Sequence, residues 1–548
     1  MKNKKTIFIM LFAFMFMLIT FAACSKGGLE PIVVTDEHGQ PITDEHGEVI
    51  TVIPVTQVVV ITGANGEEIT DENGNVVTTI EYESQTVPIP VTDDKGNVVG
   101  TTNIGVPMPD DPPPTTAVII PPSSIPQTAP NYVKYEKSFG GSGEDEFVCV
   151  EATPDGGFVA VLDTSSLDGD IPVGEGFWGK LAVICKYDKD GNLQWKKAVG
   201  GHGNTSINGI TVNSNGDIFV AGSTKDSTFA IIGSEYDGFV QKYSASGNLA
   251  FTSTWGGKLG DLFYDVATDS NGNIYAIGMS YSQDGDASTL NIAKADSKAV
   301  VVKFDSNGNL VKSTGVGSWQ DVFYQIDING NDELFVCGSF SSKTATSLFT
   351  NKGWSDVGLV KFDTALNQTW AKSWGGSQLD YATSIEATSD GGILVVGYTK
   401  SSDGNLSGVP AGGGLDAFII KWNGTGSIDW YDTCAGTKDD CFTDIFVNTD
   451  GTIYVSGYSA STTKDFNLIG NLGKNDAFIA TYSASGRFTT IRGVGGTKDD
   501  AFLGLCKLSD GNFIGVGYSL SNDRGFSIME NPSDNNKKKG VIVKITMD

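Results

Sequence analysis

The sequence predicts an all-β protein, a seven-bladed β-propeller that follows an extended N-terminal stalk. A paired-glycine mark or a close variant of it recurs seven times, 56 to 60 residues apart, between residues 140 and 496. Between the marks, apolar stretches alternate with Asn-Gly and Asp-Gly turns, which are typical of β-hairpins. Glycine accounts for 69 of the 548 residues, and this composition favours strands and turns over helices.

Each repeat unit is expected to form four antiparallel strands, and seven such units are typical of a propeller. Unit five shows the order: strands at 381–385, at 393–397 and at 416–422, and a last strand that contains Trp430. The marks that open the units are Gly140–Gly141, Gly200–Gly201, Gly256–Gly257, Val316–Gly317, Gly375–Gly376, Ala435–Gly436 and Gly495–Gly496.

The two ends of the repeat region indicate how the ring closes. The seventh unit stops after its third strand, at Val541–Lys544, whereas Tyr132–Tyr135 precedes the first mark. Tyr135 and Trp195 each lie five residues before a glycine mark, so this N-terminal segment has the register of a fourth strand. We therefore predict that residues 131–139 complete the last blade, which removes strand edges that invite aggregation.

The N-terminus reads as an export signal. Lysines at positions 2, 4 and 5 precede an apolar run from Ile7 to Ala23, and small residues stand before Cys24, as in a signal peptide. The stretch resembles a bacterial lipobox, which implies a signal peptide at 1–23 and lipidation of Cys24. The protein would then be held at the extracellular face of the cell membrane by acyl chains alone. The alternative is a plain transmembrane helix, since the apolar run is just long enough.

Residues 24–130 are expected to act as a spacer. An acidic unit related to Val-Thr-Asp-Glu-His-Gly recurs four times within 24–106, which contains few aromatic residues and predicts an extended or weakly hairpinned stalk. Nine of the 18 prolines lie within 107–130, as in a semi-rigid linker. The propeller is then assigned to 131–548.

Unit five carries the fullest form of the repeat: Gly375-Gly376 with Asp380, then Asp390-Gly391-Gly392, Gly397-Tyr398-Thr399, Ser402-Asp403-Gly404-Asn405, Asp416-Ala417-Phe418 and Trp430. This pattern resembles bacterial secreted and surface β-propeller repeat proteins over about three quarters of the chain. The resemblance implies the fold and an extracellular location. It implies no activity, because that family has no shared catalytic motif.

Charge and composition exclude several functions. The net charge is −28, so nucleic acid and anionic lipid headgroups are poor partners. The propeller has one histidine, His202, which leaves little for a Ser-His-Asp triad or a histidine-built zinc site. We expect no enzyme, although a glycosidase or lyase that needs only two carboxylates stays open. Cys434 and Cys441 flank one short turn, where a disulfide is possible.

A set of aspartates recurs four residues after the second position of the glycine mark. These residues begin the innermost strands and should surround one mouth of the central channel, where carboxylates suit Ca²⁺ or another hard cation. Alternatively, each caps its own loop by accepting backbone N–H bonds. The set comprises Asp145, Asp261, Asp321, Asp380, Asp440 and Asp500, with Thr205 in unit two.

Aromatic residues that do not repeat between units are the candidates for ligand binding. Phe177 and Trp178 lie in the long loop of unit one, Trp354 in that of unit four and Phe466 in that of unit six, whereas Trp319 precedes the first strand of unit four. Aromatic rings among polar loop residues suit a sugar or a peptide. The alternative is that these rings merely hold the loops on the blades.

Three hypotheses follow for a protein that we expect to be monomeric. The first is a lipid-anchored surface module for binding or adhesion to an extracellular glycan or protein. The second is a carboxylate-dependent polysaccharide-active enzyme, and the third is a structural protein of the cell envelope.

Overall fold

The computed structural model describes residues 132–547, except positions 175, 230–232, 234, 295, 319, 342–348, 408–411, 467–468, 470–472 and 527–536. Of the earlier residues it describes only six short strands. These pair as β1 (Ile32–Val33) with β2 (Thr51–Val52), β3 (Val58–Val60) with β4 (Thr78–Ile80), and β5 (Gln85–Thr92) with β6 (Val98–Val106). The chain divides into two units, Met1–Ile125 and Pro126–Asp548. The proposed signal peptide and Cys24 lie outside the described residues.

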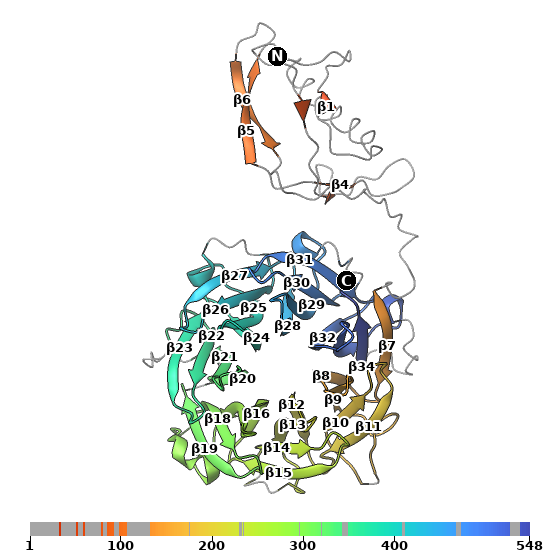
Figure 1. The fold of residues 1–548 in the computed structure, drawn as a ribbon, viewed down its shortest axis with the longest axis vertical. Helices are drawn as coiled ribbons and strands as arrows, with labels where there is room; N and C mark the ends of the chain where they lie inside the picture. Colours follow the sequence, from red (N-terminus) through yellow and green to blue (C-terminus); the bar gives the residue numbers. More distant parts are fainter. Residues whose placement is uncertain are drawn as a thin grey trace. The chain divides into compact units, whose positions relative to one another are not determined.

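The second unit is a ring of seven four-stranded antiparallel sheets (Figure 1), which confirms the predicted seven-bladed propeller. The strands of blades 1 to 4 are β8 (Asp145–Ala152), β9 (Phe158–Thr164), β10 (Leu181–Tyr187) and β11 (Leu193–Val199); β12 (Thr205–Val212), β13 (Ile218–Thr224), β14 (Asp237–Tyr243) and β15 (Leu249–Trp255); β16 (Asp261–Thr268), β17 (Ile274–Ser280), β18 (Lys298–Phe304) and β19 (Leu310–Val316); and β20 (Val322–Ile328), β21 (Leu334–Phe340), β22 (Asp356–Phe362) and β23 (Gln368–Trp374). Those of blades 5 to 7 are β24 (Asp380–Ala387), β25 (Ile393–Thr399), β26 (Asp416–Trp422) and β27 (Ile428–Cys434); β28 (Asp440–Val447), β29 (Ile453–Ser459), β30 (Asp476–Tyr482) and β31 (Phe488–Val494); and β32 (Asp500–Lys507), β33 (Phe513–Ser519), β34 (Lys539–Ile545) and β7 (Val133–Phe139).

The last blade combines both ends of the propeller sequence, as predicted. Strand β7 pairs antiparallel with β34, and Gly540 lies opposite Phe139 while Ile545 lies opposite Val133. The ring closes because β7 occupies the outermost position of blade 7, which the C-terminal strands leave empty.

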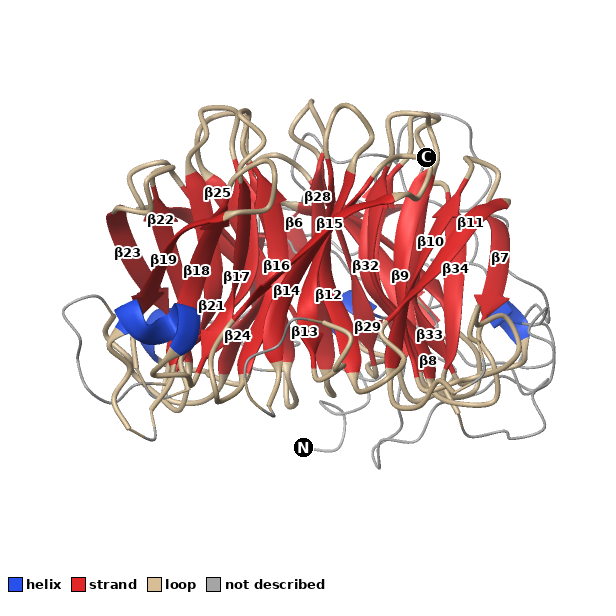
Figure 2. Cartoon of the chain, turned by 90° about the horizontal axis from the view of Figure 1, so that it is seen from below, coloured by secondary structure: helices blue, strands red, loops and turns tan. Residues whose placement is uncertain are grey.

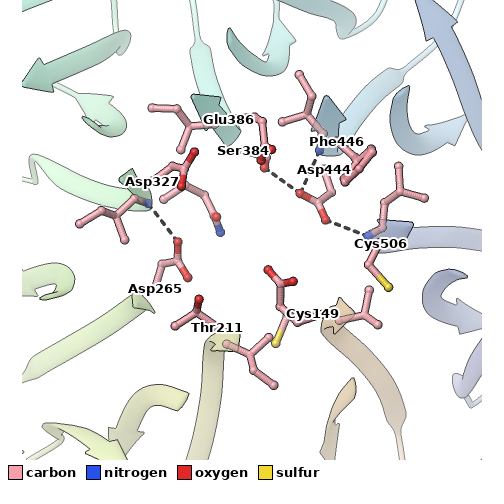
Figure 3. A pocket seen from close by; sticks show the side chains of 18 of the residues that line it. Cys149, Thr211, Asp265, Asp327, Ser384, Glu386, Asp444, Phe446 and Cys506 are labelled. Atoms are coloured by element: carbon pink, nitrogen blue, oxygen red, sulfur yellow. Dashed lines mark hydrogen bonds between the residues drawn. The ribbon is translucent and has the colours of Figure 1, made fainter. Parts of the chain in front are cut away.

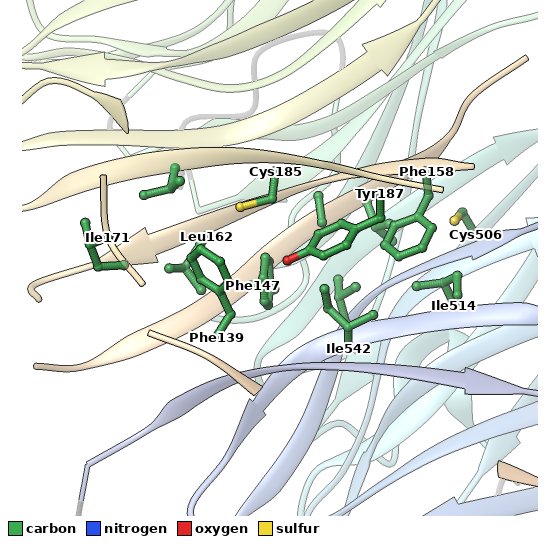
Figure 4. Packing of buried hydrophobic residues seen from close by; sticks show 14 of the residues in the cluster. Phe139, Phe147, Phe158, Leu162, Ile171, Cys185, Tyr187, Cys506, Ile514 and Ile542 are labelled. Carbon is green, nitrogen blue, oxygen red and sulfur yellow. The ribbon is translucent and has the colours of Figure 1, made fainter. Parts of the chain in front are cut away.

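The hydrophobic core is divided into layers between neighbouring blades. The layer between blades 7 and 1 contains Phe147 and Leu162 from blade 1 with Ile514 and Ile542 from blade 7 (Figure 4), and Phe139 of the closing strand packs against the same cluster. The two middle strands of a blade have core on both faces, as the fully buried β9 and β10 show. The protein therefore adds core by adding blades.

Tight turns of defined backbone conformation connect the strands. Gly391 and Gly451 occupy the turns after the first strand of blades 5 and 6 with φ of +79° and +86°, values that glycine adopts without steric cost. Blade 4 has Asp332 in this place at φ +58°. Its carboxylate accepts hydrogen bonds from Ser270 N (2.9 Å) and Oγ (2.6 Å) of blade 3, which compensates for the less favourable backbone.

The innermost strand of every blade has a β-bulge at the same place, between the third and fifth residues counted from the aspartate (or Thr205) that follows the glycine mark. In β28, which begins at Asp440, the register shifts between Phe442 and Asp444. A bulge changes the direction of the side chains that follow it. As a result, the second half of each inner strand directs different positions toward the central channel than simple alternation predicts.

Among the described residues, no helix is long and apolar enough to cross a membrane. The helical segments that the structure describes are short 3₁₀ turns, η2 (Gly285–Leu290), η3 (Gly404–Leu406), η4 (Lys464–Phe466) and η5 (Arg524–Phe526), in the loops between second and third strands. These long loops and the glycine marks lie at one end of the ring, here named the loop face, whereas the short hairpin turns form the opposite face (Figure 2).

Candidate functional site

Two tryptophans stand out on the loop face. Trp178 of blade 1 is 59% exposed and Trp354 of blade 4 is 73% exposed. The backbone of each is fixed by the next blade, because Trp178 N donates to Gly201 O (2.8 Å) and Trp354 N donates to Gln378 O (3.2 Å). Both rings are thus presented to solvent from a tethered backbone. Trp319 lies outside the described residues.

The two phenylalanines of the same set have a structural role. The ring of Phe177 packs 5.3 Å from the His202 ring and lies directly over Gly201, where an added methyl group would be 2.1 Å from it. Phe466, expected in an exposed loop position, is fully buried in the core layer between blades 5 and 6. The alternative interpretation, rings that hold loops on the blades, therefore fits Phe177 and Phe466 but not Trp178 or Trp354.

The repeating aspartates lie where the sequence predicts, at the start of the innermost strands, and all six are fully buried. Asp380 shows their common geometry: it accepts hydrogen bonds from Gly376 N (2.8 Å), from Ser401 Oγ (2.9 Å) and from the Thr399 hydroxyl. The same pattern holds Asp145, Asp261, Asp440 and Asp500. In blade 2, Thr205 instead shares a hydrogen bond with the Thr224 hydroxyl (2.7 Å).

These hydrogen bonds have the form expected of a loop cap. Burial raises the pKa of Asp440 to about 6 and that of Asp500 to about 6, although hydroxyl and backbone donors oppose the rise. Among the described residues, no group of three or more His, Cys, Asp or Glu side chains is arranged to hold a metal ion. The proposed Ca²⁺ site at this ring stays a prediction.

A further acidic cluster, which the sequence did not indicate, lines the central channel. A cavity of about 260 Å³ lies between the second halves of the inner strands, and five carboxyl groups from five blades line it: Glu151, Asp265, Asp327, Glu386 and Asp444. Figure 3 labels the last four of them. None of the six capping aspartates belongs to its lining.

The channel carboxylates connect neighbouring blades. Asp265 accepts a hydrogen bond from Ile326 N of the next blade (3.0 Å), Asp327 from Ala387 N (2.6 Å) and Asp444 from Leu505 N (2.8 Å). These N–H groups lie on the free edges of innermost strands, where no further strand can pair. The side chains thus take the place of a missing ladder partner.

Crowding of these acids in the channel changes their protonation. Burial is the largest effect on Glu151, and together with the negative charges of Asp444, Asp265 and Asp327 it raises the pKa of Glu151 to about 8. Burial also raises the pKa of Asp265 to about 8, against the effect of its hydrogen bonds to Ile326 and Val266. The channel can therefore hold protons near neutral pH.

The acidic cluster in the channel was not predicted from the sequence because of the bulge in each inner strand. Its members stand four or six residues after the capping aspartate of their unit, and the bulge between reverses the face that these two positions take relative to that aspartate. A count of acidic residues at these two positions across the seven units would have found it.

Comparisons with known proteins agree with the repeat architecture. A model of the β-propeller repeat family matches residues 194–229, which lie in blades 1 and 2. The regulatory protein FlaEY of Caulobacter vibrioides is 27% identical over 306 residues, which are 51% of this chain and 32% of that relative. The chain thus matches about a third of the relative's length.

Two solved structures are similar at low identity. A protein of unknown function from Dyadobacter fermentans is 12% identical with a TM-score of 0.41, over 75% of this chain and 98% of that one. Hydrazine synthase of Kuenenia stuttgartiensis is 11% identical with a TM-score of 0.41, over 75% and 97%.

Proposed function

We propose that this protein is a lipid-anchored binding or adhesion module that presents its propeller to an extracellular polymer or protein. The observation that carries the proposal is the exposure of Trp178 and Trp354 on the loop face, 59% and 73%. Their backbones are tied to the neighbouring blades by hydrogen bonds. A large aromatic surface on a fixed backbone can bind a partner with little loss of conformational entropy.

The surroundings of these rings suit a neutral or weakly charged partner. The protein carries 65 acidic and 37 basic side chains, so polyanions are repelled. Aromatic faces stack on the apolar faces of sugar rings or on apolar side chains of a peptide. We therefore expect a neutral glycan or a protein segment, held at a few aromatic contacts.

The N-terminal region supports display at a distance from the membrane. Lipidation of Cys24 would fix the chain to the outer surface by its acyl groups. Residues 107–130 contain nine prolines, and an extended segment of that kind spans roughly 75 Å at about 3.1 Å per residue. The spacer would allow the loop face to reach partners beyond the membrane surface.

The test is a binding screen with the unlipidated protein that begins at Ser25, against glycan and protein arrays. Once a partner is found, Trp178→Ala and Trp354→Ala should each weaken binding by about 1–3 kcal/mol. Leu249→Ala is the matched control, since Leu249 is 53% exposed on the outer strand β15, away from the loop face. Equal binding by the tryptophan variants and the control would refute the loop-face site.

The carboxylate-dependent glycan enzyme is a second candidate, which the channel acids favour. Carboxyl groups with pKa values near 8 at Glu151 and Asp265 are protonated at neutral pH, as a general acid must be. Product release from a bound polysaccharide, lost in Glu151→Gln, would establish this function. A structural envelope protein would instead bind nothing in the screen, and deletion of its gene would weaken the envelope.

A further inference from the structure

Each junction between two blades brings together two particular residues. One is the first residue of the third strand of a blade, and the other is the first residue of the inner strand of the next blade. The backbone N–H of the inner-strand residue donates a hydrogen bond to the carbonyl of the residue just before the third strand, which holds the two positions side by side. Examples are Asp380 N to Ser355 O (2.8 Å) and Asp440 N to Leu415 O (2.7 Å). The hydrogen bond is present at six junctions, whose pairs in ring order from junction 1/2 are Leu181 with Thr205, Asp237 with Asp261, Asp356 with Asp380, Asp416 with Asp440, Asp476 with Asp500, and Lys539 with Asp145. At junction 3/4 the corresponding positions are Lys298 and Asp321, which directly precedes β20.

The charges of these pairs follow a pattern around the ring. Junction 1/2 has no charged member. At junction 7/1, the ammonium group of Lys539 lies 3.4 Å from Asp145 Oδ2, and both side chains are largely buried. Four junctions instead place two acidic residues together. A buried pair of carboxylates is destabilised unless a cation or a proton lies between them, since each negative charge disfavours ionisation of the other.

The junction between blades 4 and 5 shows the geometry in detail. Asp356 Oδ2 accepts a hydrogen bond from Lys352 N (2.9 Å), whereas Asp356 Oδ1 is buried and has no hydrogen-bond partner. A methyl group added to Gly375 would lie 2.5 Å from Asp380 Oδ2 and 3.0 Å from Asp356 Oδ1. The two carboxyl groups thus approach the same point over this glycine, one through Asp380 Oδ2 and the other through Asp356 Oδ1.

The junction between blades 5 and 6 repeats this arrangement. Asp416 Oδ2 accepts from Gly412 N (2.8 Å), and Asp416 Oδ1 is again buried without a partner. Asp440 opposite accepts at Oδ2 from Gly436 N (2.7 Å) and the Ser461 hydroxyl (2.9 Å), and at Oδ1 from the Ser459 hydroxyl (2.5 Å). Asp440 Oδ1 accepts from Ser459 alone, so it can still accept one further hydrogen bond, and the Asp416 oxygen without a partner can supply it once protonated.

We propose that each of these two junctions holds one proton between its carboxyl groups, so that a carboxylic acid–carboxylate hydrogen bond joins the blades in acidic medium and is lost as the medium becomes neutral. The proton resides on the unpartnered Oδ1 of Asp356 or Asp416 and takes the place of the Lys539 ammonium at junction 7/1. Its loss returns a proton to water and leaves two carboxylates in contact, which loosens the ring at these positions.

Protonation of these acids agrees with their surroundings. Burial and, to a smaller extent, the charge of the neighbouring Asp380 raise the pKa of Asp356 to about 6, against the effect of Lys352. The charge of Asp416 likewise contributes to the raised pKa of Asp440. Of the other charged groups that face the pairs, Asp403 raises the pKa of Asp380 and Lys464 lowers that of Asp416.

The sign of the pH effect follows from these directions. A carboxyl whose pKa is higher in the folded than in the unfolded chain contributes stability that is complete below the unfolded value, about 4, and is lost as the pH rises through the folded value. The window for the two junctions therefore lies between about pH 4 and pH 7.

The experiment measures thermal unfolding of the full propeller protein between about pH 5 and pH 8, for the wild type and for the double variant Asp356→Asn, Asp416→Asn. An amide can donate to the partner carboxylate at any pH, so the variant should melt higher than wild type near pH 8 and should lose part of the wild-type decrease in Tm. Asp190→Asn with Asp429→Asn is the charge-matched control, because both residues lie in exposed turns or outer strands. It should leave the slope with pH unchanged.

A second readout tests the proton directly. The infrared band of a protonated carboxylic acid, observed in the wild type at about pH 5, should decrease in the double variant and not in the control. The proposal is overturned if the variant keeps the wild-type pH slope and this band. It is also overturned if Ca²⁺ raises, and a chelator lowers, the Tm of the wild type but not of the variant, since a metal ion would then supply the positive charge.

Discussion

The loop face contains two layers with opposite properties. The lower layer consists of acidic side chains that recur from blade to blade, such as Asp380 and Asp440, and all are buried and hydrogen-bonded. The upper layer contains Trp178 and Trp354, which have no counterpart in other blades and are exposed. The comparison teaches that a feature repeated in nearly every blade stabilises the blade, whereas an unrepeated one is free to serve binding.

The largest expected effect comes from removing a repeated strand. A protein that begins at Gly140 lacks β7, so blade 7 loses its outer strand and the buried Phe139. Burial of each large apolar side chain contributes about 1.5–3 kcal/mol, and the loss of several contacts should lower the free energy of unfolding by more than about 3 kcal/mol. The loss is measured by comparing thermal unfolding of this protein with that of a protein that begins at Pro130. Equal melting temperatures would show that the ring does not need β7.

The next effect tests the lower layer. Asp380→Ala removes the acceptor of three hydrogen bonds and leaves Gly376 N and two hydroxyls without their buried partner. We expect a loss of about 2–4 kcal/mol, since an unsatisfied buried polar group costs about 1–3 kcal/mol. Denaturant unfolding should be measured near pH 5, where we expect Asp356 to be protonated. Relief of the repulsion between Asp356 and Asp380 then does not offset the loss.

A combined variant controls for that result. Asp380→Thr together with Asp356→Leu copies the uncharged junction of Thr205 and Leu181, and it should be more stable than Asp380→Ala. If the double variant is no more stable than Asp380→Ala, the junction needs its charged residues.

The channel offers a test of intermediate size. The pKa of Asp265 is raised to about 8 by burial, so its protonated form contributes stability that is lost as the pH rises through about 8. The stability of Asp265→Asn relative to wild type should therefore rise by about 1.4 kcal/mol per pH unit below pH 8, or roughly 2 kcal/mol between about pH 5 and pH 6.5. Urea titrations at both pH values provide the measurement, and a fall in this relative stability at the higher pH would contradict the expected sign.

The smallest effect on stability is expected in the upper layer. Trp354→Ala should change the free energy of unfolding by no more than about 0.5 kcal/mol, as exposed substitutions usually do. Trp374, only 20 residues away but fully buried, is the matched control and should cost about 3–5 kcal/mol when replaced by alanine. A large loss in both variants would mean that Trp354 also supports its loop.

Much of the fold was predictable because repetition reduces the problem to one blade. The spacing of the glycine marks predicts seven units, and the missing fourth strand after Val541–Lys544 predicts closure by residues 131–139; β34 and β7 confirm both. Local turn chemistry was equally informative, since β26 has the bounds that the sequence indicates. Cys434 and Cys441, in contrast, are both buried with free thiols, so the possible disulfide is absent.

The sequence alone determined the blade count, the strand order, the closing strand and the position of the capping aspartates, because each depends on local turns and on a period along the chain. The tertiary structure decided which residues meet across blades. The channel acids Asp265 and Asp444 depend on a bulge that redirects side chains, and the acidic pairs Asp356–Asp380 and Asp416–Asp440 join strands of different blades. Such contacts arise from packing between units, which a repeat pattern within one unit does not contain.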